Sequence, residues 1–329
     1  MCNASWERFY TEPRMPVPRS AVLVFVCLVT ACAASPARAQ APPSGPLVLR
    51  LPVTPRVAAL GNAWVAGSDR EVIFYNPAQI IGARAGFDLP LIRTGAGSTL
   101  ASVGSTFAAG KWGLTLGWGA ELLRFSTDPA TSYPLAPDVL VSRGSADGVS
   151  SAFAVGGAVT VKGFRIGASG KYAFDSTPVA SGPSQAASSY QGVLMADIGV
   201  ARNKFGGTFA GSVQNLAPNP SNGSALVLPK QTLVGWSTSR PAGPLDLGIF
   251  TQLMFRHDWQ SAGGGLEAGY SWIEGYNVTL RVGAHRPEVT TEKPVALGAA
   301  FTADRLTIEY SLQLFDGGHA AHGVTFRWR

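Results

Sequence analysis

The chain has few charged residues, and it has no cysteine beyond position 32. Of its 329 residues, 14% are Asp, Glu, Lys or Arg, whereas soluble globular chains carry roughly 25%. We therefore predict that much of the surface does not face water. The three cysteines, Cys2, Cys27 and Cys32, all lie before residue 40, so the rest of the chain has no disulfide and no cysteine metal site.

Motifs of enzymes and of nucleic-acid-binding proteins are also missing. There is no Gly-x-Ser-x-Gly nucleophile motif, no phosphate-binding loop and no His-Glu-x-x-His segment. His257 and Asp258 would point to opposite faces of a strand, and His319 and His322 lack a nearby third metal ligand. Basic residues, 26 against 20 acidic ones, are scattered. We expect no enzyme activity, no cofactor, no metal and no nucleic acid.

The first 39 residues resemble an export signal. Arg19 precedes the apolar run AVLVFVCLVTACAA, and the small residues ARA precede Gln40. Fourteen residues are too few for a membrane-spanning helix, which needs about 20. We predict a signal peptide over residues 1–39, cleaved after Ala39. The alternative is a lipoprotein, because VTAC, ending at Cys32, resembles the box at which a cysteine is lipidated.

Glycine and alternating hydrophobicity dominate the remainder. The 39 glycines are spread along the chain, which favours β-structure with many turns over helices. From Phe87 onward apolar residues recur at every second position, and residues 306–314 alternate strictly between an apolar and a polar face. Such runs predict about fourteen strands, near residues 84–92, 98–108, 112–125, 149–161, 164–175, 190–201, 208–215, 229–239, 245–256, 263–273, 277–284, 294–303, 306–315 and 321–329.

The connections favour a barrel. Short turns alternate with longer loops at 126–148, 176–189, 216–228 and 285–293, as in a transmembrane antiparallel up-and-down β-barrel with short periplasmic turns. About 10 residues at roughly 3.3 Å rise and a tilt near 40° cover about 25 Å, the height of its apolar band. A soluble sandwich or propeller is the alternative. We predict an all-β fold with the barrel over residues 83–329 and a periplasmic N-terminal segment over residues 40–82.

Alternation also predicts which way side chains face. Trp112, Phe164 and Trp272 would join an aromatic belt near the short turns, with Tyr172, Phe174 and Phe315 near the other rim. The last strand carries Val324, Phe326 and Trp328 on one face, an ending typical of barrels handled by the barrel-assembly machinery. The predicted lumen-facing charges, with signs that can pair across the interior, are Glu121, Arg165, Lys171, Asp197, Glu267, Arg281 and Glu309, together with Asp175 and Arg327.

The stretch from Leu60 to Ile80 resembles the N-terminal segment of the FadL and PorV superfamily of outer-membrane barrels. The matching residues are Leu60, Gly61, Ala63, Val65, Ala66, Asp69, Asn76, Pro77 and Ala78. Arg70 stands where a second acidic residue is common, and Gln79 where glycine is common. The resemblance implies fourteen strands and a hatch inside the barrel, with Gly61, Asp69, Asn76, Pro77 and Ala78 in the hatch. The alternative is that Asn76-Pro77 is simply a turn before the first strand.

Two functions follow from this resemblance. A FadL-type protein would passively transport small hydrophobic molecules across the bacterial outer membrane, gated by the hatch. A PorV- or PorQ-like protein would be an accessory barrel of a protein-secretion system that engages secreted partners. Both place the chain in outer-membrane lipid, and a barrel without transport is the third alternative.

Overall fold

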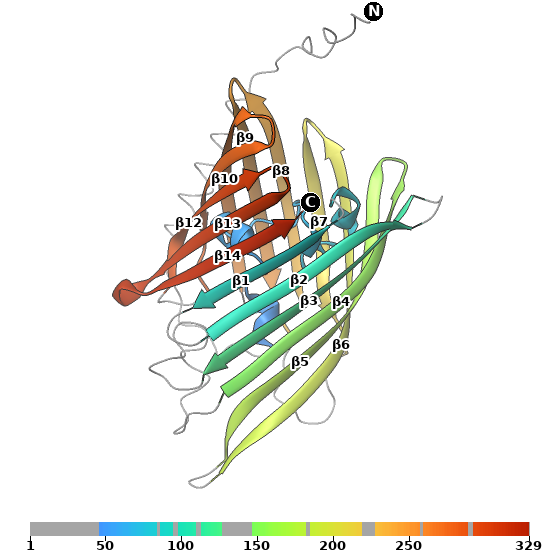
Figure 1. Ribbon diagram of the computed structural model, residues 1–329. Helices are drawn as coiled ribbons and strands as arrows, with labels where there is room; N and C mark the ends of the chain where they lie inside the picture. Colours follow the sequence, from blue (N-terminus) through green and yellow to red (C-terminus); the bar gives the residue numbers. More distant parts are fainter. Residues whose placement is uncertain are drawn as a thin grey trace, which may run out of the picture.

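The protein forms one closed barrel of antiparallel strands. The computed structural model describes residues 46–83, 86–94, 98–109, 113–126, 147–181, 185–218, 228–256, 259–288 and 292–328; the predicted signal peptide, residues 1–39, lies outside them. Within these residues fourteen strands pair in chain order (Figure 1). Strands β1 and β14 close the ring, from Phe87 opposite Trp328 to Thr94 opposite Ala321. Closure removes the free strand edges that hydrocarbon does not tolerate.

The strands match the predicted ones closely. They are β1 Phe87–Thr94, β2 Ser98–Ala109, β3 Leu114–Ser126, β4 Asp147–Val161, β5 Phe164–Ser181, β6 Gln185–Lys204, β7 Gly207–Leu216, β8 Gln231–Ala242, β9 Leu245–Arg256, β10 Gln260–Ile273, β11 Tyr276–His285, β12 Glu292–Ala303, β13 Leu306–Phe315 and β14 Ala320–Trp328. The helical elements are η1 Leu47–Arg50, α2 Pro55–Ala59, η2 Arg70–Phe74, η3 Pro77–Gly82 and η4 Asp316–Gly318. No helix in the described parts of the chain is long and apolar enough to cross a membrane.

One end of the barrel carries tight turns, and we call it the short-turn end. Lys162 and Gly163 join β4 to β5 with φ of 51° and 80°, and Phe205 and Gly206 join β6 to β7 with 53° and 73°. Positive φ at both positions is the hairpin geometry that matches strand twist. The opposite end, which we call the long-loop end, carries most of the longer connections. The predicted loop at 176–189 is wrong: β5 and β6 stay paired up to Ser181 opposite Gln185.

The outer surface of the barrel is apolar. On β3, Leu122 is 51% exposed while its neighbours Glu121 and Leu123 are buried. Outward aromatic side chains gather near the short-turn end; Trp272, for example, stacks on Phe301 with ring centroids 6.2 Å apart. Phe164 also lies there, as predicted, whereas Trp112 falls outside the described residues. An outward surface of this kind suits hydrocarbon flanked by an aromatic girdle.

Two predictions for the other rim are wrong. Phe315 is buried and faces inward, because it follows Leu314 and so occupies the inward position of β13. Tyr172 faces outward but lies in the middle of β5, since that strand continues to Ser181.

Residues 46–83, which we call the inner segment, lie inside the barrel (Figure 1). Its short helices begin at capping residues: the Thr54 side chain accepts a hydrogen bond from Val57 N before α2, and Asn76 Oδ1 accepts one from Ala78 N at 3.0 Å before η3. Asn76-Pro77 therefore starts a new helical turn, η3, shortly after η2 ends. Glycines in the wall let this backbone approach, since a Cβ at Gly283 would lie 2.3 Å from Gly61 N.

Candidate functional site

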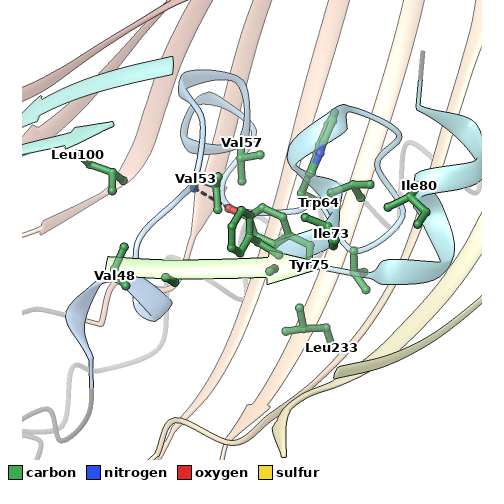
Figure 2. Close-up of a cluster of buried hydrophobic side chains, with 14 of the residues drawn as sticks. Val48, Val53, Val57, Trp64, Ile73, Tyr75, Ile80, Leu100 and Leu233 are labelled. Atoms are coloured by element: carbon green, nitrogen blue, oxygen red, sulfur yellow. Dashed lines mark hydrogen bonds between the residues drawn. The ribbon is translucent and has the colours of Figure 1, made fainter. Parts of the chain in front are cut away.

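The inner segment packs against the wall through a large apolar cluster (Figure 2). Trp64 and Ile73 of the inner segment are fully buried, as is Leu233 of β8. Within the cluster Val53 N–H donates to the Tyr75 hydroxyl at 2.8 Å. Burial of side chains this large is worth about 1.5–3 kcal/mol each, so the segment is folded onto the wall as part of the core.

Polar contacts fix the segment at its centre. Asn76 Nδ2 donates to Val65 O at 3.0 Å inside the segment and to Val200 O of β6 and Gly211 O of β7 at 3.4 and 3.3 Å. A Cβ at Gly167 of β5 would lie 2.5 Å from Ala78 N. The five predicted hatch residues all lie inside the barrel, and the side chains of Asn76 and Asp69 each bind both the segment and the wall.

An ion network joins the inner segment to the wall in the half of the barrel near the short-turn end. Arg56 lies 3.1 Å from Asp69 and 2.9 Å from Glu267, and Arg281 bridges Glu267 and Glu309 at 2.6 and 3.0 Å. Arg327 lies 3.2 Å from Asp69. Two further members complete the network, Asp88, which is 3.0 Å from Arg327, and Arg70, which pairs with Asp88. Four arginines thus face four carboxylates in a space largely shielded from water.

The acidic groups of the inner segment respond to this network in opposite ways. Burial disfavours the charge on Asp69, but Arg327 and Arg56 outweigh it and lower its pKa to about 2. Glu71 is fully buried, and neither of its carboxylate oxygens has a hydrogen-bond partner among the described residues. Burial, and then the nearby charge of Asp88, raise its pKa well above the usual value. Asp69 is therefore held as an anion and Glu71 as the neutral acid.

The predicted lumen-facing charges do face inward, but they form separate groups. Glu267, Arg281 and Glu309 belong to the ion network. Lys171 and Asp197 form a second buried pair at 2.7 Å, and Glu121 is buried close enough to Lys171 to interact with its charge. Arg165 lies near the short-turn end, where it donates to Asn203 Oδ1 at 2.9 Å.

The sequence did not predict every member of the ion network, but it did predict which side chains of the last strand face outward. It missed Arg56, Arg70, Glu71 and Asp88. Asp88 could have been found, since it alternates with the outward Leu89 and Leu91 of β1. Arg56, Arg70 and Glu71 lie in a stretch without regular hydrophobic alternation, so periodicity does not predict where their side chains point. In the last strand, Phe326 and Trp328 face outward as predicted, and Val324 shares their face.

A cavity of about 170 Å³, which we call the outer cavity, lies between the inner segment and the long-loop end. Apolar side chains line much of it, including Leu49 and Leu51 of the inner segment and Leu123 of β3. Charged residues stand at its rim: Glu288, between β11 and β12, pairs with both Arg50 and Arg256. One ion-pair cluster thus joins the start of the inner segment to the wall beside the cavity.

A second cavity, of about 160 Å³, lies toward the short-turn end. It is polar, and its lining includes Arg56, Asp69 and Arg70 of the inner segment and Asp88 and Arg327 of the wall. The inner segment thus lies between an apolar cavity on the long-loop side and a charged one on the short-turn side. The described residues hold no cluster of three metal ligands, and His257 and Asp258 fall outside them.

No protein-family model and no curated protein matches the sequence. Among solved structures, the CymD monoaromatic hydrocarbon channel is similar with a TM-score of 0.55 at 10% identity, over 84% of this chain and 96% of that one. The Pseudomonas putida toluene transporter TodX is similar with a TM-score of 0.51 at 9% identity, over 82% of this chain and 96% of that one. At such identities the likeness shows the fold, a barrel of the kind found in these FadL-type channels.

Proposed function

We propose that the chain is a bacterial outer-membrane barrel that passes small hydrophobic molecules, with the inner segment as its hatch. The observation that carries this proposal is the mainly apolar cavity inside the barrel, which is lined by the wall and by the inner segment. The apolar outer surface supports placement in lipid. The similar structures are described as a hydrocarbon channel and a toluene transporter, which agrees with a hydrophobic substrate.

The hatch role is assigned to residues 46–83, including Gly61, Asp69, Asn76, Pro77 and Ala78. Because this segment lies between the two cavities, a molecule in the outer one passes onward only when the segment shifts. The contacts that such a shift must break are the hydrogen bonds of Asn76 and the ion network. In this proposal the export signal delivers the chain to the periplasm, and the outward face of β14 engages the barrel-assembly machinery.

A matched pair of substitutions tests the transport role. Leu123 is buried and lines the cavity, whereas Leu122, the preceding residue of β3, is exposed on the outer surface. We expect Leu123→Trp to fill the cavity and lower uptake of radiolabelled toluene several-fold in bacterial cells that produce the protein. Leu122→Trp should leave uptake unchanged. Equal uptake by both variants and by cells lacking the protein would contradict transport, and co-purification of a secreted protein would then favour the secretion role.

A further inference from the structure

The outer cavity has one apolar side and one polar side. Ile92 of β1, Leu100 of β2 and Leu123 of β3 form the apolar side together with the adjoining inner segment. The polar side comes mainly from β9 to β12 and their connections, with Gln252, Arg256, His285, Arg286 and Glu292. A hydrocarbon forms no hydrogen bonds with the polar side of the cavity. The polar groups there would lose their hydrogen bonds to water when a hydrocarbon binds, and nothing would replace those bonds.

Three nitrogens on the polar side have no hydrogen-bond partner among the described residues. His285 and Trp259 are only 5% and 6% exposed, and the unpartnered atoms are His285 Nδ1 and Trp259 Nε1. The third is Arg286 Nε, and the guanidinium carbon of Arg286 lies 4.2 Å from the centre of the Trp259 ring. Buried groups of this kind cost about 1–3 kcal/mol each until something bonds them.

The hydrogen-bonding capacity of these nitrogens defines a complementary ligand. His285 Nε2 lies 2.7 Å from Glu292 Oε1, and a carboxylate accepts, so Nε2 carries a hydrogen and, in the neutral ring, Nδ1 is an acceptor. Trp259 Nε1 and Arg286 Nε are donors. A hydroxyl group, with one hydrogen and two lone pairs, can donate to the first and accept from the others. A methyl group does neither, and a carboxylate cannot donate.

The size of the cavity restricts the rest of the ligand. Its volume is about 170 Å³, and an apolar cavity of about 150 Å³ in another protein holds benzene. We propose that this cavity binds a small hydroxylated aromatic molecule, with its ring on the β1–β3 side and its hydroxyl on the side of His285 and Trp259. The inference rests on the proposed function and names its substrate class.

Phenol and toluene, which differ only by hydroxyl for methyl, test the inference. Binding of each radiolabelled compound to the purified full chain is measured in sealed dialysis cells against detergent-matched buffer. In His285→Phe and Trp259→Phe the ratio of phenol to toluene affinity should fall roughly tenfold, because phenol loses a partner and toluene loses none. Both replacements keep an aromatic ring, and heat-modifiability on a gel verifies that each variant is folded.

Trp236→Phe is the matched control. Trp236 Nε1 is also buried without a partner, but Trp236 does not line the cavity, so its replacement should leave the ratio unchanged. An unchanged ratio in the His285 and Trp259 variants would overturn the inference, as would tighter binding of benzoate than of phenol. If the inference is overturned in this way but toluene uptake still depends on Leu123, the proposed transport function remains supported without the hydroxylated substrate class. Failure of both ligands to bind would remove both proposals.

Discussion

At the scale of single residues, Glu71 couples the stability of the inner segment to pH. Its raised pKa means that the folded protein binds a proton which the unfolded chain releases above about pH 4.3. Stability is therefore complete below that pH and falls as pH rises toward the folded pKa, by up to about 1.4 kcal/mol per pH unit. We expect Glu71→Gln to remove this loss, measured as the unfolding temperature on heat-modifiability gels between pH 4 and pH 9.

Glu274→Gln is the control for this change, because Glu274 lies exposed in the turn between β10 and β11. Its pH profile should coincide with that of the unsubstituted protein. A Glu71→Gln profile that falls as steeply as the unsubstituted one would show that the neutral acid is not the origin of the pH dependence.

At the scale of the strand, alternation predicts elements and facing well wherever the two faces differ in polarity. The bounds of β13 were predicted without error because every apolar residue in it has a polar neighbour. Alternation does not identify the ends of β5 and β6 near the long-loop end, because residues 176–189 are mostly Ser and Ala, which do not distinguish a lipid face from a lumen face. The same two-residue alternation predicts which charged side chains of the strands face inward. It does not predict the positions of their partners Arg56 and Asp69, because these two residues lie in a segment whose position depends on contacts far apart in the sequence.

Depth along the strand gives a test of the membrane assignment. Leu280 lies midway along β11 and is 61% exposed, while Ile273, the last residue of β10, is 59% exposed next to a short turn. Leu280→Arg should cost about 2–4 kcal/mol and Ile273→Arg about 0–1 kcal/mol, because the penalty for arginine falls from the bilayer centre to its interface. Urea unfolding in lipid vesicles measures both. Equal costs would argue against a bilayer centred on these strands.

At the scale of the whole molecule, a closed wall and a folded interior have to be reconciled with passage of a ligand. The apolar cluster and the Asn76 hydrogen bonds hold the inner segment by its middle, and the ion network holds it toward the short-turn end. The cluster of Arg50, Arg256 and Glu288 holds its start at the rim of the outer cavity. A ligand in that cavity lies against the segment between these attachments, so its binding energy can act directly on the contacts that keep the lumen closed.

Substitution of Arg56 separates the contribution of the ion network to closure of the lumen from that of the apolar cluster. It bridges Asp69 within the segment and Glu267 in the wall, and loss of one partner from a buried ion pair costs up to about 3–5 kcal/mol. Arg56→Met should therefore raise ion conductance through the barrel in planar bilayers, whereas Arg305→Met, in an exposed turn, should not. Adding Glu267→Met should restore part of the closed state, because it removes the carboxylate that Arg56→Met leaves with one partner fewer. Conductance of Arg56→Met equal to that of the unsubstituted protein would mean that the apolar cluster alone keeps the lumen closed.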